Sequence, residues 1–363
     1  MKYTKEFPIF KTKVAGVTKK FDLSHPKDRA EYFKKKAGKE IAVLKKYLNG
    51  GGTFVAYFMG KKNAGKGTYT KLIGEIFGKE HIGHISVGDI VRGAHKAMED
   101  KKERGVLMEH LRKTYRGYIS FDESVDALLG RSATTLLPTE FILALVKRQV
   151  DMMPKKALFI DGFPRDLDQI SYALFFRDLI NYREDPDLFI AIDIPNAVID
   201  ERIKYRVVCP LCQTPRNLKL LATKDVGYDK ERKIFYLKCD DPNCKKPGTR
   251  MEGKEGDNLG IGPIRERIKR DGELIDTMFT LHGVPKILLR NAIPVKVAKK
   301  YVDAYEITPE YVYAHDAKTG KIKTIEKPWT VKDDEGVEVM SLLAPTVVVS
   351  LLKQLPGALN LRV

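Results

Sequence analysis

The sequence predicts an α/β fold in which helices flank a parallel sheet. Three apolar runs are typical of buried strands, because β-branched and aromatic residues fill them almost without interruption. These runs are residues 53–59, 157–160 and 188–194. Segments with helical spacing alternate with them, at residues 141–150 and 195–203. Strands that alternate with helices in this way favour a parallel sheet with helices on its faces.

A glycine-rich loop after the first strand indicates a phosphate-binding site. Three glycines lie within residues 60–68, which we call the P-loop, and helix-forming residues 70–77 follow. Free N–H groups at a helix N-terminus attract phosphate, glycines let the backbone approach it, and Lys66 adds a mobile cation. Gly67 stands where the strict patterns GxxxxGKS and GxxxxGKT have a hydroxyl, and Thr68 comes one residue later. The loop predicts nucleotide binding without naming a reaction.

The length, net charge and apolar segments of the chain limit the classes of protein to which it can belong. Its 363 residues can bury a full core, and its formal net charge of +17 suits polyanionic ligands such as nucleotides or RNA. A Lys-rich composition gives the same balance without such a partner. The first residues lack the apolar core of a signal peptide, and Pro345 interrupts the apolar segment at 341–352. We therefore expect a soluble, cytoplasmic monomer without a membrane span.

The remaining elements follow from local patterns. Residues 28–48 predict a helix with one apolar side, formed by Tyr32, Phe33, Ile41, Leu44 and Leu48. Residues 294–298 predict a further strand, and residues 345–355 predict a closing helix. The irregular segment at 311–325 predicts a hairpin.

Four cysteines gather in one short segment and indicate a metal site. They are Cys209, Cys212, Cys239 and Cys244. Two close pairs on two turns are typical of tetrahedral zinc sites. The polar segment around them has little core of its own, and zinc binding contributes directly to the folding of such modules. We therefore predict structural Zn²⁺, with free buried thiols as the alternative.

Three later segments supply arginines near turns or helix starts, at residues 84–92, 159–169 and 201–206. Such a set suits phosphoryl transfer, because the transferred group needs positioning and charge neutralisation, and arginine binds phosphate in a bidentate manner. The P-loop and these segments, in this order, resemble the adenylate kinase family of nucleoside monophosphate kinases, whose loop also ends in GKGT. The resemblance covers about residues 53–300.

The resemblance implies a P-loop NTPase-like core with two inserted pieces. The core would comprise residues 51–86, 151–206 and 260–310. A helical insertion for the monophosphate would occupy residues 87–150, and a zinc-binding lid would occupy residues 207–259. Outside them lie a basic N-terminal extension (residues 1–50) and a C-terminal segment with the hairpin and the closing helix (residues 311–363).

The resemblance also implies a reaction, reversible phosphoryl transfer from Mg-ATP to AMP that gives two ADP. It implies catalytic roles for Lys66, Asp161, Arg165, Arg206 and Arg267, with Asp161 holding hydrated Mg²⁺. Implied ATP-binding residues are Gly60, Asn63, Ala64, Gly65, Lys66, Gly67, Thr68, Tyr69, Arg202 and Arg206. Implied AMP-binding residues are Val87, Gly88, Arg92, Leu137, Gly162, Arg165, Gln169 and Arg267. Asp257 and Asn258 take the place of an acidic pair in the family's lid.

Two other functions stay open. The Gln169 amide can pair with an adenine edge, and UMP/CMP kinases have Asn there. Val87 replaces the family's usual Thr, however, and residues 93–137 are longer than usual, so a UMP/CMP or broad-specificity kinase is one alternative. The other is a zinc-ribbon nucleic-acid-binding protein on a P-loop fold. Residues 1–50 contain 14 Lys or Arg against 5 Asp or Glu, but their aromatic residues have core-like spacing, so nucleic-acid binding is the weaker prediction.

Overall fold

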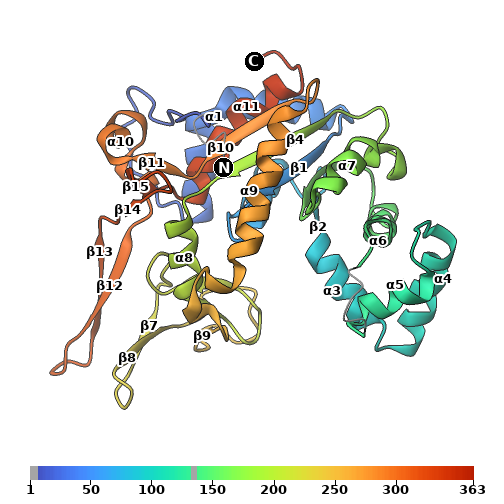
Figure 1. The fold of residues 1–363 in the computed structure, drawn as a ribbon. Coiled ribbons are helices and arrows are strands. Elements are labelled where there is room, and N and C mark those ends of the chain that lie inside the picture. Colours follow the sequence, from blue (N-terminus) through green and yellow to red (C-terminus); the bar gives the residue numbers. More distant parts are fainter. Residues whose placement is uncertain (1–6, 132–136) are drawn as a thin grey trace.

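The computed structural model describes residues 7–131 and 137–363, so residues 1–6 of the predicted extension and 132–136 of the predicted insertion lie outside the described residues. A central sheet of five parallel strands organises the fold (Figure 1). The strands are β1 (Val55–Gly60), β2 (Ile82–Ser86), β3 (Ala157–Asp161), β4 (Asp187–Asp193) and β10 (Lys286–Arg290). Their order in the sheet is β10-β4-β1-β3-β2. The predicted α/β fold with a parallel sheet is confirmed.

Helices cover both faces of this sheet. In β1, Ala56 and Phe58 pack into one hydrophobic cluster, while Tyr57 and Met59 pack into another, as expected for side chains that alternate along a strand. The first face is covered by α1 (Pro26–Asn49), α2 (Lys66–Phe77) and α11 (Ala344–Ala358), and the second by α6 (Thr139–Asp151), α7 (Leu167–Leu179) and α9 (Arg265–Thr280). Among the helices of the described ranges, none combines the length and apolar character that a membrane crossing requires.

The strand order brings the P-loop and the chain after β3 together. β1 lies between β3 and β4. The chain first extends the sheet on one side of β1, through β2 and β3, and then on the other side, through β4 and β10. Phe58 of β1 is the register partner of Asp161. In open parallel sheets, ligands bind at such a switch point, beyond the carboxyl ends of the strands. The motifs singled out in the sequence therefore meet at one edge of the sheet.

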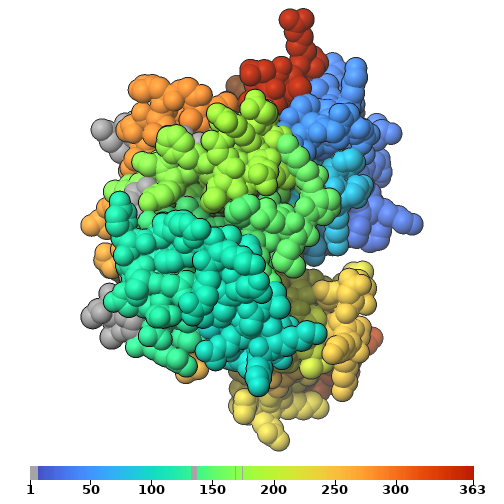
Figure 2. Space-filling model, turned by 90° about the vertical axis from the view of Figure 1, so that its right-hand side faces the viewer, coloured from blue at the N-terminus to red at the C-terminus, as the bar shows by residue number. Residues whose placement is uncertain are grey.

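The insertion is a helical lobe with its own small core. It contains α3 (Val87–Ala97), α4 (Lys101–Thr114) and α5 (Phe121–Leu128), which pack with α6 around Leu111 and Phe141. Ser120 and Glu123 form a capping box that starts α5. In the space-filling view of Figure 2, the insertion (teal) and the lid (yellow) are separate lobes on the lower side of the core. The predicted domain boundaries agree with these lobes but stay predictions.

The lid is built from short strands and turns. After α8 (Asn196–Lys204) come β5 (Arg206–Val208), β6 (Pro215–Asn217), β7 (Val226–Asp229), β8 (Ile234–Leu237), β9 (Glu252–Gly253) and the short 3₁₀ turns η2 (Asp257–Leu259) and η3 (Gly262–Ile264). β5, β6 and β9 form one sheet, and β7 and β8 form a hairpin. Its buried cluster consists of Leu237, Met251 and three of the cysteines, so the lid has little apolar core.

One predicted strand is wrong. Residues 295–301 form the helix α10 (Val295–Tyr301), and the strand β11 (Ala292–Pro294) ends where this helix begins. Val295 and Val297 alternate as in a strand, but Pro294 at the N-cap has a fixed φ that suits the start of a helix. Two strands of the central sheet, β2 and β10, were not predicted from the sequence.

The C-terminal segment adds two further pieces to the core. β14 (Val331–Lys332) and β15 (Glu338–Ser341) form a three-stranded sheet with β11. A short 3₁₀ turn, η4 (Ala304–Glu306), precedes the predicted hairpin, which is confirmed as β12 (Glu310–His315) and β13 (Ile322–Lys327). The predicted closing helix is confirmed as α11.

The hairpin β12–β13 packs along the lid (Figure 1). The Tyr313 hydroxyl donates to the carbonyl oxygen of Leu218 at 2.7 Å, and the Tyr311 N–H donates to that of Lys219 at 2.7 Å. The His315 ring stacks on Tyr228, with 4.3 Å between the ring centroids. Polar and aromatic contacts thus join the hairpin to the lid.

The described part of the N-terminal extension, residues 7–50, packs on the folded core. Its predicted helix is confirmed as α1, and Lys36 of this helix is buried with its ammonium 2.7 Å from Asp303 and 3.3 Å from Glu306. The Tyr32 hydroxyl donates to Glu306 at 2.6 Å. A buried charge needs such partners, so this network fixes α1 on the C-terminal part of the chain. Tyr32 and Phe33 are buried, as their core-like spacing predicts.

Candidate active site

The P-loop connects β1 to α2 in a shape that suits phosphate. Gly65 has a φ of 103°, a left-handed conformation that glycine adopts without strain, and Asn63 has a φ of 66°. Gly65 is the N-cap of α2 and has no side chain that could cap it, so the N-terminus of α2 is open to an anion. Lys66 is the first residue of α2, and its ammonium donates to the carbonyl oxygen of Gly60 at 2.7 Å.

Two carboxylates flank the P-loop. Asp161, at the end of β3, lies 3.6 Å from the Lys66 ammonium. Asp271 of α9 accepts a hydrogen bond from the Lys62 N–H at 3.0 Å, and burial raises its pKa although Lys66 and Arg267 lower it. Asp161 was predicted from the sequence, whereas Asp271 was missed. Its position four residues after Arg267, on the same helix face, is the signal that could have found it.

Arg92 and Arg165 converge on Gly88, and Arg165 also lies against Gly162. A Cβ atom placed on Gly88 would lie 3.2 Å from Nη2 of Arg165 and 3.4 Å from Nη1 of Arg92. A Cβ atom on Gly162 would lie 3.2 Å from the same Nη2 of Arg165. The two distances of 3.2 Å are tighter than ordinary van der Waals contact, so both glycines make room for the Arg165 guanidinium group. The predicted monophosphate residues of α3 and of the chain after β3 are therefore brought together.

The Arg165 guanidinium lies in a partly buried position near charged groups of both signs. Burial lowers its pKa, and the charge of Arg267 lowers it further, while Asp161 acts in the opposite direction. Its Nε has no hydrogen-bond partner among residues 7–131 and 137–363. Two cations that face each other with an unpaired donor form an arrangement that an anion would stabilise.

Gln169 supports Arg165 in this conformation. Its side-chain oxygen accepts the backbone N–H of Arg165 at 2.8 Å, and its Nε2 donates to the Thr139 hydroxyl at 3.0 Å. Gln169 and Leu137 also line a cavity of about 710 Å³. Val87 is fully buried at the start of α3 and packs in the core cluster. Recognition of a base by Val87, Leu137 and Gln169 stays a prediction.

Arg202 and Arg206 lie on the other side of the P-loop. Arg206 donates from Nε and Nη2 to the two oxygens of Asp257, both at 2.7 Å, which agrees with the acidic role inferred for Asp257. Arg202 donates to the carbonyl oxygen of Asn63 at 3.3 Å and to the side-chain oxygen of Asn291 at 3.0 Å. The sequence analysis missed Asn291, which has no motif around it.

Asn291, the partner of Arg202, links helix α2 to the core. Asn291 is buried, and its Nδ2 donates at 2.9 Å to the hydroxyl of Tyr69, a fully buried residue of α2. Tyr69 was predicted as an ATP-binding residue. Its buried ring places it beneath the loop, as a support for the helix.

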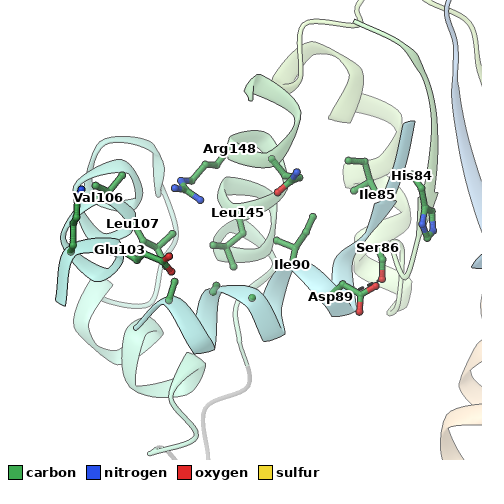
Figure 3. A pocket seen from close by; sticks show the side chains of 15 residues that line it. His84, Ile85, Ser86, Asp89, Ile90, Glu103, Val106, Leu107, Leu145 and Arg148 are labelled. Atoms are coloured by element: carbon green, nitrogen blue, oxygen red, sulfur yellow. Dashed lines mark hydrogen bonds between the residues drawn. The ribbon is translucent and has the colours of Figure 1, made fainter. Parts of the chain in front are cut away.

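A second cavity lies within the insertion, between β2, α3, α4 and α6 (Figure 3). Its volume is about 740 Å³, and its wall includes Ser86, Asp89, Ile90, Leu145 and Arg148. The predicted monophosphate residues Gly88, Arg92 and Arg165 do not line it among the residues that the structure describes. The insertion thus contains a cavity that is separate from the site formed by Arg92 and Arg165.

The four cysteines form a site that fits zinc. Their sulfur atoms all lie within 4.8 Å of one another, with 3.9 Å between Cys209 and Cys244 and 3.6 Å between Cys212 and Cys239. Ligand sulfurs about 2.3 Å from a tetrahedrally bound zinc ion are roughly 3.8 Å apart. Cys209, Cys239 and Cys244 are buried. The donor set and its spacing agree with the predicted structural Zn²⁺.

Comparison with known proteins identifies the family to which the chain belongs. No family model matches it. The adenylate kinase of Kosmotoga olearia, however, is 30% identical over 238 residues, which are 64% of this chain and 96% of that protein. The chain belongs to the adenylate kinase family.

Other adenylate kinases match shorter parts. That of Petrotoga mobilis is 28% identical over 213 residues, or 58% of this chain and 77% of that protein. That of Thermotoga petrophila is 29% identical over 170 residues, or 46% of this chain, and the match spans 65% of that protein's length. Membership of the adenylate kinase family supports nucleoside monophosphate kinase activity, a phosphotransferase reaction. The resemblance recognised in the sequence is therefore confirmed.

Proposed function

We propose that this protein transfers the γ-phosphoryl group of Mg-ATP to AMP and gives two ADP. The observation that supports this most is the convergence of Arg92 and Arg165 at Gly88, with Arg165 also against Gly162. It provides an anion site at the same sheet edge as the open N-terminus of α2, so two phosphate groups could be held side by side. The names of the relatives point to the same reaction.

In this proposal the P-loop holds the ATP phosphates. The N–H groups of α2 and the Lys66 ammonium would bind the outer phosphates, and Lys66 would exchange its contact with the Gly60 carbonyl oxygen for a phosphate oxygen. Arg202 and Arg206 would flank the nucleotide from α8 and β5. Because phosphoryl transfer needs mainly positioning and charge neutralisation, these donors would supply much of the catalysis.

Asp161 would hold a hydrated Mg²⁺ ion. Its side chain is 25% exposed at the edge of the sheet, and Mg²⁺ prefers carboxylate oxygens while it keeps several water ligands. The bound ion would neutralise negative charge on the ATP phosphates. The Asp161 carboxylate also orients Lys66, whose ammonium lies 3.6 Å away.

Arg165, Arg92 and Arg267 would hold the monophosphate and neutralise the charge that develops during transfer. Arg165 and Arg267 come from the chain after β3 and from α9, so they reach the same point from two elements. The lid, with its proposed structural Zn²⁺, would close over the two nucleotides and exclude water, which would otherwise accept the phosphoryl group.

AMP is the proposed monophosphate, and direct comparison of substrates tests it. We expect purified protein to phosphorylate AMP faster than UMP or CMP with Mg-ATP. Beside its contacts with the Arg165 backbone and Thr139, the Gln169 amide has a second lone pair and a second N–H, which would pair with an adenine edge. Gln169→Asn should reduce the AMP preference by about tenfold, since it withdraws the amide by one methylene. A coupled assay of ADP formation gives both results.

The same assay contains its controls. Omitting Mg²⁺ should abolish turnover in all reactions. Faster turnover of UMP or CMP than of AMP would contradict the AMP assignment and support the pyrimidine alternative. The absence of turnover with all three monophosphates would contradict the kinase proposal itself.

A further inference from the structure

Lys61, the second residue of the P-loop, has an unexpected partner in the C-terminal segment. Lys61 is only 4% exposed, and it lies behind the loop. Its ammonium donates to the carbonyl oxygen of Ile194 at 2.9 Å and to the Asp334 carboxylate at 2.8 Å. A buried ammonium group is costly unless its hydrogen bonds are made, so the position of Lys61 depends on these two acceptors.

The backbone of Lys61 shapes the P-loop. Its carbonyl oxygen accepts the Ala64 N–H at 3.1 Å, and it lies 3.3 Å from the Lys66 ammonium that donates to it. A shift of Lys61 would therefore change both the turn of the loop and the place of its cation. The side-chain contacts of Lys61 and the geometry of the phosphate site are linked through one residue.

Asp334 also holds the helix that presents the proposed ATP arginines. Its second carboxylate oxygen accepts the N–H of Asn196, the first residue of α8, at 2.8 Å. Arg202 lies on α8, and Arg206 begins β5 two residues after this helix ends. A negative charge at a helix N-terminus is favourable. One carboxylate thus joins the P-loop to the element that carries Arg202.

Hydrogen bonds within the turn that contains Asp334 fix its conformation. The carboxylate of Asp333 accepts the N–H groups of Glu335 at 3.0 Å and Val337 at 2.8 Å. Gly336 has a φ of 81°, which glycine adopts without strain. Asp333 also lies 3.8 Å from Arg290, at the end of β10. The turn is therefore fixed in its own shape and tied to the central sheet.

We propose that Asp334 is a positioning residue for ATP binding, acting through Lys61 and through the first turn of α8. It touches neither the reacting atoms nor the phosphates. It keeps the P-loop and Arg202 at the separation that the ATP phosphates need. This proposal rests on the assignment of the P-loop as the ATP site, and it adds residues of the C-terminal segment to that site.

The test separates ATP binding from monophosphate binding. We expect Asp334→Ala to raise the Kd for Mg-ATP by about tenfold, because two charge-assisted hydrogen bonds are lost, and to leave the Kd for AMP within about twofold. Lys61→Met should weaken ATP binding to a similar extent, and the double variant should lose little more, since both changes remove one contact. Asp334→Glu should restore most of the affinity because it keeps the carboxylate. Titration calorimetry measures these constants without turnover.

Glu335→Ala is the matched control, because it removes the next carboxylate of the same turn. This carboxylate is exposed like that of Asp334, but in the described structure it bonds neither Lys61 nor the N–H of Asn196. It should leave ATP affinity unchanged. Circular dichroism and the melting temperature show whether each variant is folded, and if Asp334→Ala is not, Asp334→Asn takes its place because it keeps one acceptor oxygen. Unchanged ATP affinity in folded Asp334→Ala, or in Asp334→Asn where that variant takes its place, would overturn the positioning role.

The outcome also distinguishes this inference from the proposed function. If the wild-type protein binds ATP but phosphorylates no monophosphate, the reaction is wrong while the Asp334 comparison still decides the positioning role. If it phosphorylates AMP and Asp334→Ala binds ATP normally, the positioning role alone is wrong. A wild-type protein that does not bind ATP would overturn both.

Discussion

Replacing Arg165 by alanine should lower kcat/KM for the monophosphate by about 10²- to 10³-fold, the usual effect of removing one preorganised donor to a developing charge. Arg165 is half-buried, its Nε is unpaired in the described structure, and Gly88 and Gly162 leave space around its guanidinium group. Steady-state kinetics with the monophosphate varied at saturating Mg-ATP measures the loss.

Three further variants make this result specific. Arg165→Lys should recover only part of the activity, because an ammonium group cannot make a bidentate contact. Arg92→Ala should have a smaller effect, since Arg92 is 73% exposed and already pairs with Asp89. Arg183→Ala, at a surface arginine that is 79% exposed, should leave activity unchanged. A loss below about tenfold for Arg165→Ala would contradict its proposed role.

Removing one zinc ligand should have the second large effect. Cys209 is fully buried, and the lid has only a small apolar cluster besides the cysteines, so its folding should depend on the metal. Zinc binding contributes roughly 10 kcal/mol or more to the folding of small zinc modules. We expect Cys209→Ala to reduce the zinc content from one ion per chain to nearly none and to lower the melting temperature.

Activity should fall with the metal, because an unfolded lid cannot cover the nucleotides. Metal analysis, thermal melting and turnover should change together, both in Cys209→Ala and in wild-type protein treated with a chelator. Leu211→Ala is the matched control, since Leu211 lies in the same turn but is 49% exposed. Metal-free wild-type protein with an unchanged melting temperature would contradict the structural zinc site.

Local patterns predicted the parts of the fold that local sequence determines. β1, β3 and β4 are long apolar runs, and α1 and α11 show helical spacing, so each was found. β10 was missed because only three apolar residues lie between its terminal Lys286 and Arg290. Residues 294–298 alternate like a strand, and only the conformation of Pro294 shows that a helix begins there.

The candidate site was predictable where its residues belong to motifs. Arg165, Asp161 and the four cysteines lie in recognisable patterns, and the structure brings each set together. Asn291 and Asp334 were missed because their contacts join segments far apart in the chain. Arg202 meets Asn291 across 89 positions, and Lys61 meets Asp334 across 273 positions. Spacing along a sequence holds no information on such pairs.

The contact between the hairpin β12–β13 and the lid gives the lid a second attachment besides its two chain ends, which matters for the lid closure proposed above. A lid that is joined to the core only by its two chain ends can pivot there freely. Here Tyr313 and His315 hold it along one side through a hydrogen bond and a stacked ring. Closure must either carry the hairpin with the lid, so that the pivot shifts to the base of β12 and β13, or expose these aromatic rings to water. The energy of opening and closing therefore depends partly on residues that lie outside both nucleotide sites.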